Sequence, residues 1–171
     1  PTSDRAREGL FSSLSSTFGS LDGLHFLDLF AGSGAVGVEA LSRGAGLVEA
    51  VESNPVSAKV CEDNFSLLTG SEAVGQFKVH TKTVFEYLNH LATGSFEIIY
   101  IDPPYEVENT EVEKILKKIF NLNLLNKFGV IAIERDAKGK TFSWPEGFSE
   151  LKVRSYGAGA IHYGVLTERN L

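Results

Sequence analysis

The sequence contains no methionine, one cysteine, one tryptophan and five prolines among its 171 residues. The lone Cys61 excludes an internal disulfide framework, so we expect a reducing compartment such as the cytoplasm. No apolar run approaches the roughly 20 residues needed to cross a bilayer, which argues against a membrane protein. The chain opens at Pro1 without methionine or a signal-like pattern, and we interpret this start as a trimmed end.

Basic residues are also in deficit, since 16 Lys plus Arg against 22 Asp plus Glu leave a net charge of -6. This balance argues against a broad electrostatic grip on nucleic acid, so any nucleic-acid partner must be held locally. The four histidines are scattered, with no i, i+4 pair and no neighbouring cysteine. We therefore expect no metal site.

Strand-length apolar runs alternate with segments of helical period, which is typical of a parallel sheet covered by helices. The length and a hydrophobic content of 43% predict a single domain over residues 1–171. The predicted strands are 25–30, 47–52, 76–81, 96–101 and 128–134. The predicted helices are 4–18, capped by Ser3 or Asp4, and 35–43, 55–68, 84–91 and 110–120. Two strand-like runs around Gly157 and Gly159 predict an antiparallel hairpin at one edge of the sheet.

Ligands of an open α/β sheet collect beyond the carboxyl ends of its strands. The first predicted strand is followed by "FAGSG", which supplies Phe30, Ala31, Gly32, Ser33 and Gly34. The second is followed by Glu52, Ser53 and Asn54, the third by 81–84, and the fourth by "DPPY". We expect these four strand ends to share one rim.

The glycines of "GSGAVG" suit a nucleotide-like cofactor, because they let the backbone approach a ligand without Cβ interference. Glu52 stands where such sites place a ribose-binding acid, in NAD proteins and S-adenosylmethionine proteins alike. Asp28 helps more to distinguish an S-adenosylmethionine site from an NAD site, because an acid inside an apolar strand needs a cation or hydrogen-bond donors as partners. The ammonium group of a bound methionine moiety would be such a partner.

The "DPPY" corner favours an amino methyltransferase. Pro103 and Pro104 fix φ and lack N–H groups, so the corner is rigid and non-helical. The Asp102 carboxylate and the Pro103 carbonyl can then accept hydrogen bonds from one exocyclic amino group. Tyr105 offers a flat face on which an extruded base can stack.

Together, "PTSDRARE", "LDLFAGSGAVGVEALSRGA", "VESN" and "FEIIYIDPPY" closely resemble the RsmD-like bacterial 16S ribosomal RNA guanine-N2 methyltransferases. The resemblance covers nearly the whole chain. It implies a Rossmann-like, mostly parallel seven-stranded sheet with helices on both faces, a cofactor-binding half near 24–92 and a catalytic half near 95–171. It also implies methyl transfer from S-adenosylmethionine to a guanine of 16S ribosomal RNA, in a ribosomal particle, by a monomer.

By resemblance, the cofactor-binding residues are Asp28, Phe30, Ala31, Gly32, Ser33, Gly34, Glu52, Ser53 and Asn54, and the catalytic corner is Asp102, Pro103, Pro104 and Tyr105. The sequence has Thr83 where many methyltransferases have an adenine-binding Asp, so we expect backbone groups of Val84 or Phe85 to make that contact. The family motif also places Arg5 and Arg7 beside the site, where they would meet phosphate or the cofactor carboxylate.

Three alternatives remain open from the sequence. Adenine-N6 methyltransferases of DNA and glutamine methyltransferases of proteins use similar corners, although Asp102 and the N-terminal motif favour guanine. A catalytically silent RNA-binding module is a second alternative, against which the intact "DPPY" argues. An NAD dehydrogenase is the third, but 171 residues leave little room for a substrate domain.

Overall fold

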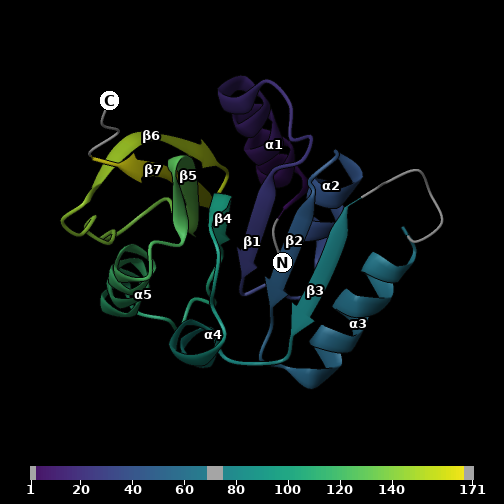
Figure 1. Ribbon diagram of the computed structural model, residues 1–171. Coiled ribbons are helices and arrows are strands. Elements are labelled where there is room, and N and C mark those ends of the chain that lie inside the picture. Colours follow the sequence, from purple (N-terminus) through teal and green to yellow (C-terminus); the bar gives the residue numbers. More distant parts are fainter. Residues whose placement is uncertain (1–2, 69–74, 168–171) are drawn as a thin grey trace.

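The computed structural model describes residues 3–68 and 75–167, in which helices and strands alternate along most of the chain (Figure 1). The strands are β1 (His25–Leu29), β2 (Leu47–Val51), β3 (Gln76–His80), β4 (Phe96–Ile101), β5 (Leu125–Asp136), β6 (Phe148–Tyr156) and β7 (Gly159–Leu166). The helices are α1 (Asp4–Phe18), α2 (Ala35–Ser42), α3 (Pro55–Ser66), α4 (Val84–His90) and α5 (Asn109–Asn121). Every predicted helix and strand is present, and β5 is longer than predicted at both ends.

The strands form one seven-stranded sheet in the order β3-β2-β1-β4-β5-β7-β6. The first five are parallel, whereas β7 runs antiparallel to both β5 and β6. This confirms the predicted mostly parallel sheet with a C-terminal antiparallel hairpin. The winding reverses between β1 and β4, and the ends of strands at such a switch point are where α/β folds bind ligands.

Helices cover both faces of the sheet, because the strands are apolar on both sides. On one face, Phe26 and Ile98 join a buried cluster with Leu10 and Phe11 of α1 and Phe65 of α3. On the other face, a second cluster combines strand and helix residues, among them Leu27, Ile99, Tyr87, Ile115 and Leu116. Figure 1 shows α4 and α5 together, on the side away from α1. The sheet is thus a rigid platform whose strand ends hold the loops of the site.

The helices begin where the sequence provides caps. The Ser3 hydroxyl accepts the Ala6 backbone N–H at 3.1 Å, so Ser3, not Asp4, is the N-cap of α1. Pro55 occupies the first turn of α3, where its missing N–H is not needed. Gly37 lies in α2, where an added Cβ would be 3.0 Å from Val48 Cγ1 and 2.9 Å from Phe65 Cζ. A glycine here lets α2 pack closely against β2 and α3.

The C-terminal hairpin turns at Gly157, whose φ of 62° is in the left-handed region, as predicted from its glycines. Its outer strand β6 is the edge of the sheet, and β7 lies inside, paired with β5. Gly164 of β7 lies against Trp144, since an added Cβ would come within 3 Å of the indole ring. The last strand of the described residues, β7, is therefore an interior strand of the sheet.

Candidate functional site

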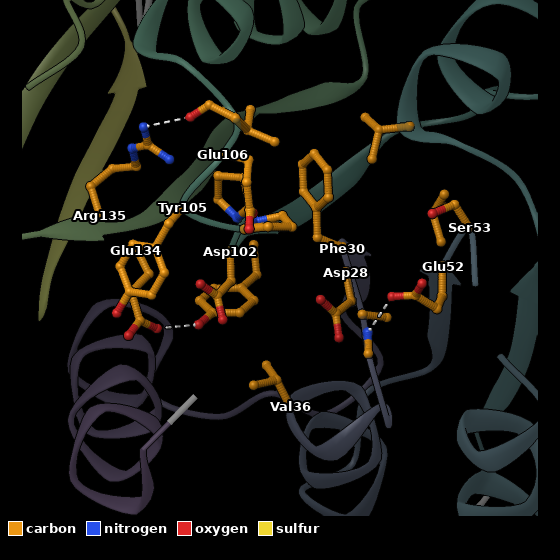
Figure 2. Close-up of a pocket in the computed structure, with 18 of the residues that line it drawn as sticks. Asp28, Phe30, Val36, Glu52, Ser53, Asp102, Tyr105, Glu106, Glu134 and Arg135 are labelled. Carbon is orange, nitrogen blue, oxygen red and sulfur yellow. Dashed lines mark hydrogen bonds between the residues drawn. The ribbon is translucent and has the colours of Figure 1, made fainter. Parts of the chain in front are cut away.

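A pocket of ≈ 1110 Å³ lies at the carboxyl ends of β1, β2, β4 and β5 and at the start of α4. Loops from all four predicted strand ends line it, which confirms the expectation of one shared rim. The predicted site residues in its lining are Arg7, Asp28, Phe30, Ala31, Gly32, Ser33, Glu52, Ser53, Thr83, Val84, Phe85, Asp102, Pro103, Pro104 and Tyr105. Figure 2 shows several of these side chains converging from separate strands.

The loop after β1 is shaped by backbone conformations that favour glycine. Gly32 has a φ of 57° and open space where a Cβ would project, so this loop leaves room for a ligand. Gly34 has a φ of 82° and caps α2, but an added Cβ would lie 2.5 Å from Cys61 Sγ. Phe30 also has a positive φ, 63°, although it carries a large side chain. Such strain in a non-glycine residue occurs often at functional sites.

Glu52 holds this loop through two backbone hydrogen bonds. Its Oε1 accepts the N–H of Gly32 at 2.9 Å, and its Oε2 accepts the N–H of Asn54 at 2.7 Å (Figure 2 draws the first of these bonds). Each carboxylate oxygen has a second lone pair, so Glu52 can still accept bonds from a ligand. The acid thus fixes the shape of the glycine loop and stays available in the pocket.

Asp28 is buried at the base of the pocket, with 1% of its surface exposed. Neither carboxyl oxygen has a hydrogen-bond partner within the described part of the chain. Burial raises the pKa of Asp28 well above its usual value, and the charge of Asp102 raises it further, while the nearby Gly37 amide offsets part of the rise. A buried acid without a partner is costly, and a donor or cation entering the pocket would relieve that cost.

The start of α4 forms another part of the wall. The Thr83 hydroxyl accepts the Glu86 N–H at 3.1 Å, and the Glu86 carboxylate accepts the Thr83 N–H at 2.8 Å. The Thr83 side chain is thus engaged in a capping box. Val84 and Phe85 begin the helix, where backbone N–H groups have no acceptor within the helix. The capping box thus uses one lone pair of the Thr83 hydroxyl, and the helix start places the N–H groups of Val84 and Phe85 in the wall of the pocket.

The side chains of the "DPPY" corner, which follows β4, differ in how deeply they are buried. Pro103 is buried, whereas Tyr105 has 82% of its surface exposed at the mouth of the pocket. The carbonyl of Pro104 accepts the Val107 N–H at 3.0 Å, which closes a tight turn after the corner. An exposed aromatic ring beside a deep pocket is suited to stacking on a planar ligand.

The residues missed by sequence reasoning come mainly from the end of β5, in "IERD". Glu134 and Arg135 both line the pocket. The Tyr100 hydroxyl donates to Glu134 Oε2 at 2.7 Å, and burial, followed by the Asp102 charge, raises the pKa of Glu134. Their position could have indicated them, because they lie at the carboxyl end of the fifth parallel strand, as the predicted site residues do at the ends of the other strands.

Arg135 fastens the loop after "DPPY" to β5. Its Nη2 donates to the Val107 carbonyl at 2.8 Å and to Asn109 Oδ1 at 2.9 Å, and Asn109 Nδ2 donates to the Lys140 carbonyl at 2.9 Å (Figure 2 draws the first of these bonds). Lys82, Lys138 and Lys140 also line the pocket. Basic side chains are therefore present beside a pocket whose base is acidic.

Three predicted site residues do not line the pocket: Arg5, Gly34 and Asn54. Arg5 is exposed on α1, whereas Arg7 donates to Glu39 Oε1 of α2 at 3.1 Å and to Asp4 Oδ1 at 3.1 Å. Residues two apart on a helix point in different directions, so only one of the two arginines can face the site. Asn54 is the N-cap of α3, where its side chain accepts from the N–H groups of Val56 and Ser57.

Two further features concern metals and membranes. Across residues 3–68 and 75–167, no group of three or more His, Cys, Asp or Glu side chains is placed to hold a metal ion. In the same part of the chain, no helix is long and apolar enough to cross a bilayer.

Cys61 is buried against the glycine loop, and its burial raises the pKa of the thiol to about 12. A thiol held protonated in this way acts as a packing residue.

The strand order, the glycine loop and the "DPPY" corner define a protein of the methyltransferase class of α/β folds. The yhhF protein of Escherichia coli has the same fold, with a TM-score of 0.83 and 25% identity, covering 97% of this chain and 87% of that one. The family model described as conserved hypothetical protein 95 matches residues 1–165. The chain belongs to that family, and its resemblance to RsmD-like proteins is confirmed.

Two relatives agree with this assignment, and a more distant structure shares the fold. "Ribosomal RNA small subunit methyltransferase D" of Haemophilus influenzae is 30% identical over 158 residues, covering 92% of this chain and 78% of the relative. The YlbH protein of Bacillus subtilis is 30% identical over 164 residues, covering 94% of this chain and 84% of the relative. The rRNA methyltransferase aviRa of Streptomyces viridochromogenes shares the fold, with a TM-score of 0.75 and 15% identity, covering 98% of this chain and 86% of that one.

Proposed function

We propose that the chain is an S-adenosylmethionine-dependent methyltransferase that modifies the N2 amino group of a guanine in 16S ribosomal RNA. The observation that carries the proposal is that the "DPPY" corner and the glycine loop with Glu52 open into the same pocket. Acceptors for an amino group and a cradle for a nucleotide-like cofactor are thereby brought together. The named relative supports ribosomal RNA as the substrate class.

The residues at the base of the pocket fit S-adenosylmethionine. Asp28 is a buried carboxyl without a partner, which suits the ammonium group of a methionine moiety. Gly32 leaves open space beside the backbone, and Glu52 keeps lone pairs for ribose hydroxyls. With the cofactor bound, the backbone N–H groups of Val84 and Phe85 at the start of α4 would contact its adenine.

The catalytic role of the corner is to hold and polarise the amino group. When bound, S-adenosylmethionine supplies an electrophilic methyl group on a sulfonium centre. The Asp102 carboxylate and the Pro103 carbonyl accept the two amino protons, which localises the lone pair on nitrogen and aims it at the methyl carbon. With the cofactor bound, the nitrogen would take its methyl group and leave the thioether S-adenosylhomocysteine, and Asp102 would receive the amino proton that is lost. Tyr105 stacks on the extruded base.

The proposal includes the cellular setting. We propose that the chain acts in the cytoplasm, as a monomer on a ribosomal particle. We propose that this methyl transfer requires no metal ion, since the neutral thioether released from a sulfonium is already a good leaving group. Arg7, Arg135, Lys82, Lys138 and Lys140 line the pocket and provide local positive charge for the RNA, despite a net charge of -6.

The experiment is methyl transfer from labelled S-adenosylmethionine to small ribosomal subunits prepared from cells in which this gene is deleted. Digestion to nucleosides then identifies the modified base. We expect label in N2-methylguanosine at one position of 16S RNA. Label in N6-methyladenosine, or in protein, would replace guanine as the target, and the absence of label in every fraction would refute a methyltransferase of this class.

The matched variant is Asp102→Ala. Because Asp102 acts on the amino group and not on the cofactor, calorimetry should show nearly unchanged affinity for S-adenosylhomocysteine. Single-turnover assays at saturating cofactor should show a rate lower by roughly a hundredfold or more, the scale for losing one preorganised polar group. A wild-type rate in this variant would remove Asp102 from the reaction.

A further inference from the structure

Glu134 stands beside Asp102 at the end of the neighbouring strand. Ile101 of β4 is in register with Ile133 of β5, so the next residue of each strand, Asp102 and Glu134, lie side by side. Figure 2 shows the two carboxyl groups on the same side of the sheet edge. The charge of Asp102 is also one of the causes that raise the pKa of Glu134. The pocket thus contains a pair of carboxyl groups, of which the "DPPY" motif accounts for one.

Glu134 is held in place by one oxygen and accessible at the other. Its Oε2 accepts the hydroxyl of buried Tyr100 at 2.7 Å, which fixes the orientation of the group. Its Oε1 lies near Gly159 of β7, where an added Cβ would be 3.3 Å away. Both Glu134 and Gly159 line the pocket. A glycine at this position leaves Oε1 uncovered by a side chain.

The corner and Glu134 together offer three acceptors: the Asp102 carboxylate, the Pro103 carbonyl and Glu134 Oε1. Resting on the proposed function, we propose that Glu134 determines the choice of base by accepting the N1–H of guanine while the corner accepts the N2 amino protons. Guanine presents three donors on this edge, one from N1 and two from N2. Three acceptors and three donors therefore match.

Other amino substrates lack the third donor. Adenine and cytosine each place a ring nitrogen with a lone pair next to the amino group, and a glutamine side chain places a carbonyl oxygen there. An ionised Glu134 would face that lone pair, which is repulsive and leaves a buried acceptor unpaired. Glu134 thus excludes adenine, cytosine and glutamine by a mismatch that Asp102 and the prolines alone would not create.

The test uses 2-aminopurine, which keeps the amino group of guanine at C2 but has a lone pair at N1. Once the target guanine is mapped, 16S RNA is ligated around a synthetic segment carrying either guanine or 2-aminopurine there, and is reconstituted into particles. Methyl transfer is compared for wild type, Glu134→Gln and Glu106→Gln at one fixed pH of about 8, because burial raises the pKa of Glu134 and the ionised carboxylate is favoured at higher pH. Glu106 is an exposed acid that also lines the pocket, so Glu106→Gln removes the same charge nearby.

Wild type should methylate guanine at least about tenfold faster than 2-aminopurine, the scale for one charge-assisted hydrogen bond. The Glu134→Gln variant should lose or reverse this preference, because its amide can donate to N1 of 2-aminopurine, with Glu106→Gln behaving like wild type. Equal rates on the two bases for wild type would overturn the proposal even if Glu134→Gln does not fold. An unchanged preference in a folded Glu134→Gln protein would overturn it as well. Failure of wild type to methylate guanine particles would instead refute the proposed function.

Discussion

Replacing Asp28 with Asn should make the ligand-free protein more stable and the cofactor complex weaker. Burial and the charge of Asp102 raise the pKa of Asp28 in the folded state, so the native protein keeps a proton that the unfolded chain releases. The stability that Asp28 contributes is therefore fully present below the unfolded pKa and is lost as the pH rises toward the folded pKa. An asparagine does not titrate, so Asp28→Asn should escape this loss.

The size of the gain has a ceiling set by the unfolded state. Keeping a carboxyl group protonated at pH 7, when its unfolded pKa is about 3.9, costs at most about 4 kcal/mol. The amide in Asp28→Asn is itself a buried polar group without a partner, which returns part of this gain. We therefore expect Asp28→Asn to add roughly 1–3 kcal/mol at neutral pH, or roughly 3–10 °C in Tm.

Cofactor binding should move in the opposite direction. The ammonium group of S-adenosylhomocysteine is the same as that of the methyl donor, and a neutral amide cannot make a charge-assisted bond to it. Losing such a bond weakens binding by roughly 1.5–3 kcal/mol, or roughly 10- to 100-fold. The assay pairs urea unfolding of both proteins from about pH 4 to 8 with calorimetric titration of S-adenosylhomocysteine.

The two proteins should have similar stability at acid pH and diverge as the pH rises, with Asp28→Asn above wild type. If Asp28→Asn is less stable than wild type at neutral pH, and increasingly so as the pH rises, Asp28 is ionised and paired in the native protein, and the reasoning fails. Unchanged affinity for S-adenosylhomocysteine would separately exclude the ammonium contact. A stabilised variant with weakened binding is the only outcome that supports both parts.

Three further predictions concern the rest of the pocket. Glu52→Ala should weaken S-adenosylhomocysteine binding by roughly 1–3 kcal/mol in calorimetry. The reason is that two backbone N–H groups lose their carboxylate acceptor and the ribose contact is lost as well. Unchanged affinity would exclude Glu52 from the cofactor site. Tyr105→Ala should weaken engagement of the RNA by roughly 1–3 kcal/mol in single-turnover titrations, whereas Tyr105→Phe keeps the stacking face and should be nearly silent; a large loss in Tyr105→Phe would assign the role to the hydroxyl. Gly34→Ala should lower Tm more than Gly32→Ala, since both have positive φ but only at Gly34 would the new Cβ meet Cys61; equal melting curves would contradict this.

Much of the site was predictable because parallel strands bring their carboxyl ends to one rim. Asp28 and Gly32 at the end of β1, Glu52 after β2 and Asp102 after β4 come from three separate parts of the sequence, yet all four line the pocket. Apolar strand runs are recognisable without knowledge of their order in the sheet. The residues of the rim could therefore be predicted from the sequence, whereas the order β3-β2-β1-β4-β5 became known only from the structure.

The roles of individual side chains were less predictable, because several of them bind backbone groups or pack against distant elements and do not face the pocket. Asn54 follows β2 like Glu52, but its amide oxygen caps α3, so it does not line the pocket. Gly34 packs against Cys61, so that a side chain at this position would collide with it, and this contact depends on the packing of α3. Arg7 reaches the pocket through its pairing with Glu39 of α2, which depends on where α1 lies against the sheet. Contacts between distant elements of this kind are not encoded in local spacing.

The position of β7 between β5 and β6 bears on how the chain folds as it is synthesised. β5 carries Glu134 and Arg135, but its second neighbour, β7, follows both β5 and β6 in the sequence and is therefore synthesised after them. At roughly 5–20 residues per second, β5 would wait for its partner for roughly one to five seconds, with one row of backbone N–H and C=O groups unpaired. During that interval β5 is an exposed edge strand that can pair with strands of other nascent chains. Aggregation of this protein in cells should therefore depend on translation speed through the segment between β5 and β7.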